Sequence, residues 1–241
     1  MSERSALAPA LGTAAAVALA ATVALGLSLP ETVEQGPYSR LIAIHPGLAW
    51  ASYLAFGVTA LASALWLWPR TRSQTADLVA GASAEIGVVF TALTLLTGSI
   101  WGRPTWGQWW VWDARLTLSA LMLALYLGYL ALRRVPADPD TRARRSAVTA
   151  LLTVLVVPVN HFAVEWWRTL HQGRSLNQLD PGSDLDGSFI VAMLVGFLAM
   201  TLVYGWLLLQ RTEVARREDR REDAALAEAL AERRREAVLT P

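Results

Sequence analysis

Six long apolar runs constrain the fold of this chain more than any other feature. They lie near residues 9–29, 46–68, 78–101, 114–132, 146–166 and 188–210. A helix needs about 20 residues to cross the hydrocarbon of a bilayer, at about 1.5 Å per residue. Because a backbone in lipid must satisfy its own hydrogen bonds, these runs predict helices. The sequence therefore predicts an all-α, polytopic membrane protein with six transmembrane helices.

The distribution of arginine predicts the orientation of these helices. All 21 basic residues are Arg, and with the N-terminus inside, 16 of them fall on the inner side and five on the outer side. Such a bias follows the positive-inside rule. We therefore expect cytoplasmic N- and C-termini, with segments 30–45, 102–113 and 167–187 on the outer side. Membrane lipid is therefore an expected partner of the chain, and nucleic acid is not.

The chain divides into a membrane domain, residues 1–211, and a charged cytoplasmic tail, residues 212–241. In the tail, Arg and Glu often lie one helical turn apart, which predicts a solvated helix. Within the third run, Glu85 is an intramembrane carboxylate, so we expect it to face the bundle interior, protonated or hydrogen-bonded. It suits a functional group and an interhelical contact equally well. Pro158 and Asn160 predict a kink in the fifth helix.

A tryptophan-rich segment, residues 101–117, separates the third and fourth helices and reads WGRPTWGQWWVWDARLT. Its glycines and Pro104 indicate a turn-rich loop and not a continuation of the helix. Tryptophan favours the membrane interface, so an aromatic belt is one interpretation. A platform for a large flat ligand is the other. The five indoles belong to Trp101, Trp106, Trp109, Trp110 and Trp112.

Two charged residues close this segment. Asp113 stands where the fourth helix begins, which suits an N-cap. Arg115 is placed to extend its guanidinium to lipid headgroups. Arg103 and Arg115 are also suitable partners for carboxylates on an anionic ligand.

The chain has only three histidines, and two of them fall on the predicted outer face. His45 precedes Pro46 at the start of the second helix, and His171 follows the outer end of the fifth. A lone surface histidine is rarely a ligand, but two beside a tryptophan-rich loop favour haem, for which imidazole is a common axial ligand. His161, inside the fifth helix, suits polar packing or an interfacial position.

Several strings resemble one superfamily. The run WGQWWVWDARLT, preceded by FTALTLLTGSIWG, resembles the tryptophan-rich signature of the haem-handling proteins CcmC, CcmF and CcsA of cytochrome c maturation. The strings IHPGLAW and VEWWRTLHQG, the length and the six spans resemble CcmC in particular. The resemblance covers about residues 40–210. One departure is the pair Asn160 and His161, where apolar or Tyr residues are expected.

The resemblance implies a haem transport and delivery protein, not an enzyme. It would hold b-type haem at the outer face and deliver it to the haem chaperone CcmE during c-type cytochrome biogenesis, with the ABC transporter subunits CcmA and CcmB and the small protein CcmD. It assigns iron ligation to His45 and His171. The residues expected around the haem are Trp101, Arg103, Trp106, Trp109, Trp110, Trp112, Asp113, Arg115, Trp166 and Trp167.

Two other classes compete with this interpretation. A b-type membrane cytochrome acting in electron transfer needs histidine pairs buried at matching depth in facing helices. A structural transporter subunit would use the tryptophans only as a belt and would bind no haem.

Overall fold

The computed structural model describes residues 3–171 and 186–239. These residues form helices, joined by short connections with one isolated bridge between Thr32 and Gly36. The helices are α1 (Glu3–Ser28), the short 3-10 helix η1 (Pro37–Ala43), α2 (His45–Leu67), α3 (Gln74–Trp106), α4 (Ala114–Arg134), α5 (Pro139–Thr153), α6 (Val156–Trp166) and α7 (Gly187–Leu239).

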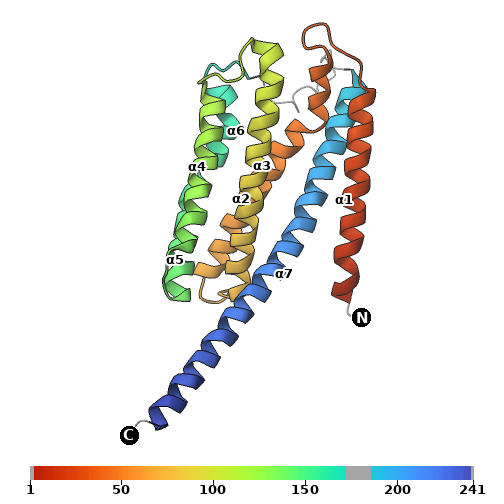
Figure 1. The fold of residues 1–241 in the computed structure, drawn as a ribbon. Coiled ribbons are helices and arrows are strands. Elements are labelled where there is room, and N and C mark those ends of the chain that lie inside the picture. Colours follow the sequence, from red (N-terminus) through yellow and green to blue (C-terminus); the bar gives the residue numbers. More distant parts are fainter. Residues whose placement is uncertain (1–2, 172–185, 240–241) are drawn as a thin grey trace.

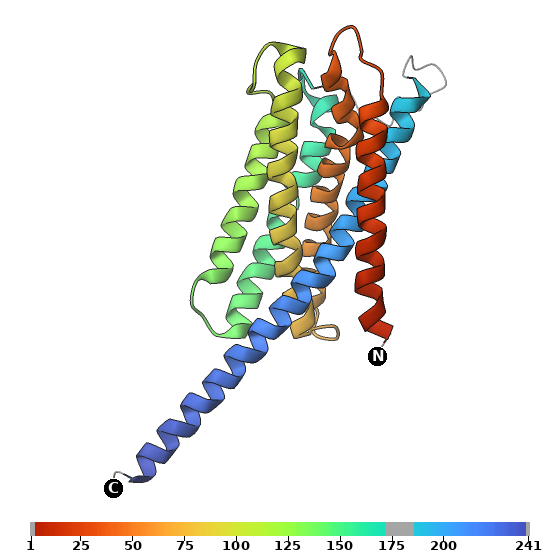
Figure 2. The ribbon, with the colours of Figure 1, turned by 45° about the vertical axis from the view of Figure 1, so that its right-hand side comes forward.

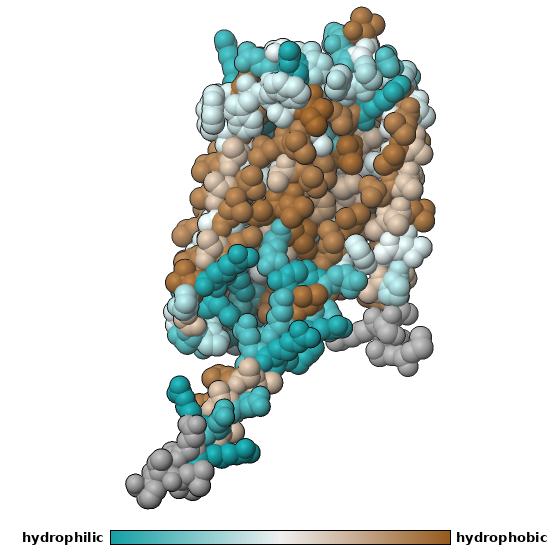
Figure 3. All heavy atoms as spheres, in the orientation of Figure 1, coloured by the Kyte–Doolittle hydropathy of each residue, from teal (hydrophilic) through white to brown (hydrophobic). Residues whose placement is uncertain are grey.

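The helices run along one another in an elongated bundle (Figure 1, Figure 2). Six segments are long and apolar enough to cross a membrane, with α5 and α6 together forming the fifth. A hydrophobic band covers the middle of the face seen in Figure 3, between more hydrophilic ends. The predicted all-α, six-span membrane architecture is confirmed. Below, the end where α2 begins is called the His45 end and the other the Arg133 end.

The tryptophan-rich segment is more helical than predicted. Residues Trp101–Trp106 continue α3, so the expectation of a turn-rich loop from residue 101 is wrong for its first six residues. Pro104 has no N–H to donate to Ile100 O, so it removes one helical bond, and the helix ends two residues later. The helix ends at Gly107, whose positive φ of 75° forms a left-handed C-cap with its N–H donating to Arg103 O at 3.0 Å.

The fifth span is broken, as Pro158 predicts. Helix α5 ends at Thr153 and α6 begins at Val156. The break includes Val154, four residues before Pro158. A proline ring clashes with the carbonyl of the residue four positions before it, so Pro158 displaces the Val154 carbonyl. The span also starts earlier than expected, at Pro139, where Asp138 Oδ1 accepts from Thr141 N at 3.0 Å as an N-cap. Residues 139–145, which precede the predicted run, are therefore helical.

A close helix crossing fixes the His45 end. Helix α7 passes the junction of η1 and α2 at two glycines, Gly196 and Gly47. A Cβ on Gly196 would lie 1.9 Å from Ala43 O, and one on Gly47 would lie 2.7 Å from Gly196 O. Backbone therefore packs directly on backbone here, which only glycine permits. The crossing sets the position from which α2, and His45 with it, begins.

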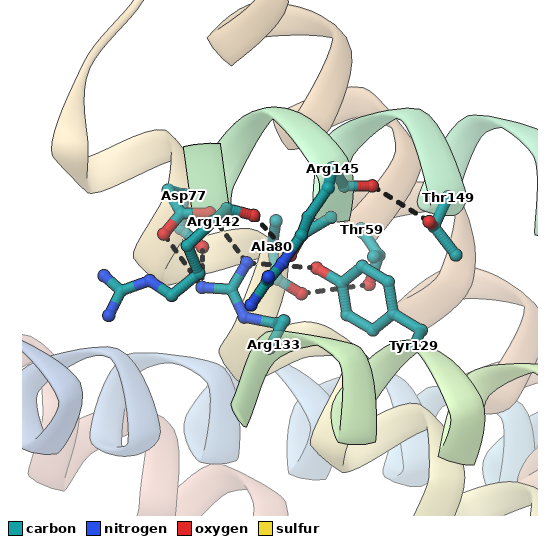
Figure 4. A network of polar contacts seen from close by, with 9 residues as sticks. Thr59, Asp77, Ala80, Tyr129, Arg133, Arg142, Arg145 and Thr149 are labelled. Carbon is teal, nitrogen blue, oxygen red and sulfur yellow. Dashed lines mark hydrogen bonds and ion pairs between the residues drawn. The ribbon is translucent and has the colours of Figure 1, made fainter. Parts of the chain in front are cut away.

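A buried ion pair joins helices at the Arg133 end (Figure 4). Arg133 of α4 binds Asp77 of α3 with two bonds, Nη1 to Oδ1 at 2.7 Å and Nη2 to Oδ2 at 2.8 Å. The Tyr129 hydroxyl accepts a longer bond from Arg133 at 3.4 Å. Asp77 is only 7% exposed, so the paired guanidinium compensates a carboxylate that would otherwise be costly to bury.

Glu85 is hydrogen-bonded to an arginine of another helix. Arg211 of α7 donates from Nε to Glu85 Oε2 at 2.5 Å and from Nη2 to Oε1 at 3.1 Å. Arg211 also reaches Glu218, one of the first acidic residues of the tail. Helix α7 continues without a break from the span into residues 212–239 and projects beyond the bundle (Figure 1).

Candidate functional site

A cavity of about 370 Å³ lies at the His45 end of the bundle. It is enclosed by α2, α3, α4 and α6, with contributions from Gln35, Phe197 and the segment after α6. Six of the residues predicted for the site line it: His45, Trp101, Trp106, Trp110, Arg115 and His171. The two histidines, 126 positions apart in the sequence, thus reach one cavity.

His45 is the first residue of α2, and Pro46 follows it at a position where helices readily accept proline. Its ring is held against α3. Nδ1 lies 2.9 Å from Thr97 Oγ1, and the ring meets the Trp101 indole at 90°, with centroids 5.7 Å apart. Trp101 is fixed in turn, because its Nε1 donates to Gln35 Oε1 at 3.0 Å.

His171 belongs to the segment that follows α6. Its ring lies 6.4 Å from that of Trp106. Asp113 ties this segment to the tryptophan-rich loop: Oδ1 accepts from Leu116 N at 2.8 Å, capping α4, and Oδ2 accepts from Leu170 N at 3.1 Å. The predicted N-cap is therefore confirmed. The second bond, which sequence did not reveal, holds the residue before His171.

Arg115 turns inward, toward the middle of α6. Its Nη1 donates to Asn160 O at 2.8 Å and to His161 O at 3.1 Å. Asn160 is 1% exposed and donates to Ser119 Oγ at 3.1 Å. These bonds join α4 to α6 across the cavity wall. Arg115 is therefore engaged with backbone carbonyls and does not extend to headgroups.

The other predicted residues lie outside the cavity wall. Arg103 donates to Gly107 O at 2.9 Å, which secures the end of α3. Four tryptophans are largely exposed: Trp109 (59%), Trp112 (80%), Trp166 (58%) and Trp167 (49%). Trp112 contacts Trp110 edge-on, with ring centroids 5.4 Å apart. The tryptophans of the motif thus divide into cavity-lining and surface residues.

Comparison with known proteins places this arrangement in a family. The sequence model of CcmC, described as heme exporter protein C, matches residues 1–225. This chain belongs to the CcmC family. It is 41% identical over 215 residues to heme exporter protein C of Bradyrhizobium diazoefficiens, covering 88% of this chain and 80% of the relative. For the protein of the same name from Haemophilus influenzae, identity is 39% over 207 residues, covering 85% and 82%.

The family extends to a mitochondrial relative. A putative cytochrome c biosynthesis ccmC-like mitochondrial protein of Marchantia polymorpha is 33% identical over 183 residues, which are 76% of each chain. The resemblance drawn from the tryptophan-rich motif is confirmed at the level of CcmC. The family is one of transport proteins and not of enzymes.

Several cavity residues of this CcmC family member were not predicted. Thr97 and Gly98 lie one helical turn before Trp101, a spacing that puts them on the same face of α3. That spacing from Trp101 was the signal in the sequence that could have identified them. Asn160 and His161, the departure from the expected pattern, both line the cavity, and the His161 ring lies 6.0 Å from that of Tyr53.

Proposed function

We propose that this chain holds haem as cargo in the cavity at the His45 end and delivers it to the haem chaperone CcmE during c-type cytochrome biogenesis. The observation that carries the proposal is that His45 and His171 line one cavity together with four tryptophans, three of them from the tryptophan-rich segment. Imidazole nitrogen is a common ligand of haem iron. His45 and His171 are the proposed iron ligands.

The cavity residues other than the two histidines suit the porphyrin ring and the carboxylates of haem. Haem is a flat, largely apolar macrocycle that carries two carboxylates. Trp101, Trp106 and Trp110 offer large apolar ring surfaces. The Trp110 Nε1–H is buried and has no hydrogen-bond partner in the part of the chain described. Leaving a buried donor without a partner costs about 1–3 kcal/mol of free energy. A hydrogen bond from this N–H to a haem carboxylate would recover that cost. Arg115 supplies the positive charge in the same wall.

The proposal includes an orientation. The arginine bias supports cytoplasmic termini and a tail, residues 212–241, on the cytoplasmic side of a bacterial inner membrane. Since the His45 end lies opposite to the end from which α7 projects (Figure 1), the cavity would then open toward the periplasm, where the chaperone would receive haem. CcmA, CcmB and CcmD are the proposed partners of the assembly.

The exposed tryptophans have a separate proposed task. Trp109, Trp112, Trp166 and Trp167 do not line the cavity, so we assign them to contact with the chaperone and the membrane surface. Asp113 and Arg103 support them indirectly by holding the loop between α3 and α4.

Haem content tests the binding part of the proposal. The chain is purified in mild detergent, and haem is quantified from the Soret band and the pyridine haemochrome. The wild type is expected to retain haem, His45→Ala and His171→Ala to retain less, and the double variant to retain none. His161→Ala is the matched control, because His161 lines the same cavity. Unchanged haem in the double variant would overturn the ligand assignment.

Transfer tests the delivery part. Haem-loaded wild type in vesicles is mixed with purified CcmE, and haem is followed from one protein to the other. Movement of haem without net oxidation or reduction of a quinol is expected. Quinol-linked turnover without transfer would instead support the b-type cytochrome, which the family membership disfavours.

A further inference from the structure

The outer third of α3 surrounds the His45 ring on three sides. The Thr97 hydroxyl lies at Nδ1, Gly98 lies beside Cε1, and the Trp101 indole stands perpendicular to the ring. The three residues fall within one and a half turns of a single helix, so they present one continuous face.

The hydrogen bonds of Thr97 decide which nitrogen of His45 carries the proton. A hydroxyl has one hydrogen to donate. Thr97 Oγ1 points that hydrogen at the backbone of its own helix, 2.8 Å from Leu93 O and 3.2 Å from Thr94 O. Toward His45 the oxygen is left as an acceptor, so the donor in the 2.9 Å contact is His45 Nδ1–H. In the neutral ring Nε2 then keeps its lone pair.

Gly98 provides the space that this ring position needs. A Cβ built on Gly98 would stand 3.0 Å from His45 Cε1 and 3.8 Å from both ring nitrogens. A contact of 3.0 Å is closer than two carbons normally approach. Alanine at residue 98 would therefore push the ring away from α3 and lengthen the bond to Thr97. Glycine in the interior of a helix costs up to about 1 kcal/mol relative to alanine, so helix propensity does not account for it.

We propose that Thr97 and Gly98 are positioning residues for the haem ligand: Thr97 fixes His45 as the tautomer with Nδ1 protonated and Nε2 open to iron, and Gly98 admits the ring. The inference rests on the proposed function, since it takes His45 as an iron ligand. Ligating histidines commonly donate their second nitrogen to a neighbouring acceptor, and loss of that acceptor typically weakens metal affinity about 10- to 100-fold. Here a threonine hydroxyl, anchored to its own helix, takes that role.

The tautomer is measured first, without haem. Because the chain has three histidines, histidine-selective ¹⁵N labelling gives three ring pairs, assigned with His161→Asn and His171→Asn. In the wild type at neutral pH, His45 is expected to show a protonated Nδ1 and an unprotonated Nε2. Thr97→Val, which keeps the branched shape and removes the acceptor, should mix the two tautomers. Thr97→Ser should restore the wild-type spectrum.

Haem retention is measured second, with ferric haem titrated into the same proteins in detergent. Thr97→Val and Gly98→Ala are expected to release haem about 10-fold faster or more, while Thr97→Ser stays close to the wild type. Gly128→Ala is the matched control for Gly98→Ala, because a Cβ there meets no atom of the described residues within 4 Å. Thermal unfolding of each variant separates loss of fold from displacement of the ring.

The outcomes separate the two proposals. A wild-type His45 with Nε2 protonated, or a Thr97→Val variant with wild-type tautomer and haem release, would overturn the positioning role. A wild type that shows the expected tautomer but binds no haem would instead contradict the proposed function.

Discussion

Gly196→Ala is expected to open the helix crossing that positions His45. The added Cβ would meet Ala43 O at 1.9 Å, whereas a carbon and a carbonyl oxygen normally approach to about 3.3 Å. The backbones must therefore separate by about 1.4 Å. A backbone carbonyl cannot rotate away like a flexible side chain, so the cost falls at the upper end of the range for overpacking, about 3 kcal/mol. Alanine's better helix propensity returns about 1 kcal/mol, which leaves a net loss of about 2 kcal/mol.

Thermal and denaturant unfolding in detergent, followed by circular dichroism, measure this loss. Gly128→Ala and Gly57→Ala are matched controls, since within the part of the chain that the structure describes a Cβ at either site meets nothing within 4 Å. Both should be neutral or slightly stabilising. Because Ala43 lies two residues before His45, Gly196→Ala should also weaken haem retention. If Gly196→Ala unfolded like the two controls and kept haem equally well, the proposed close packing of α7 on the start of α2 would be refuted.

Two further predictions concern the ends of the bundle. Asp77→Asn and Arg133→Met should each cost about 3–5 kcal/mol, because each leaves a charge in the bundle without its partner, and the double variant should cost less than the sum of the two; a double-mutant cycle of unfolding free energies checks this, and additive losses would contradict it. Asp113→Ala should lose about 1 kcal/mol of capping energy and also weaken haem retention, since it releases the segment that carries His171. Asp138→Ala removes the N-cap of α5 at the other end of the bundle, so it should lower stability without weakening haem retention. Equal haem retention in the two variants would contradict the proposed link between Asp113 and the position of His171.

The six spans were predictable because length and composition determine whether a helix can cross a bilayer. Local breaks were predictable only in part. The kink before Pro158 follows from proline geometry, and the structure has it at residues 154–155. Pro104 is also a proline, yet α3 continues through it to Trp106. The helix ends instead at Gly107, which has a positive φ. The amino-acid sequence alone did not show whether Pro104 or Gly107 would end α3.

Which side chains line the cavity was harder to predict. Trp109 and Trp110 are neighbours in a non-helical loop, yet only Trp110 lines the cavity. No helical period governs such a loop, so residue type alone could not separate the two. The pairs Asp77–Arg133 and Glu85–Arg211 join residues 56 and 126 positions apart, and such partners depend on how the helices pack. The choice of His45 and His171 rested on the outer face that the order of the spans predicts for both, and on the resemblance to the haem-handling proteins.

The central claim is that His45 and His171 together hold the iron of the cargo. Low-temperature electron paramagnetic resonance of the ferric-haem-loaded protein tests it most directly. The wild type is expected to give a low-spin signal typical of two imidazole ligands. His45→Gly and His171→Gly should each give high-spin haem that returns to low spin when free imidazole is added. A wild type that is high-spin, or a low-spin signal unchanged in both glycine variants, would contradict the account.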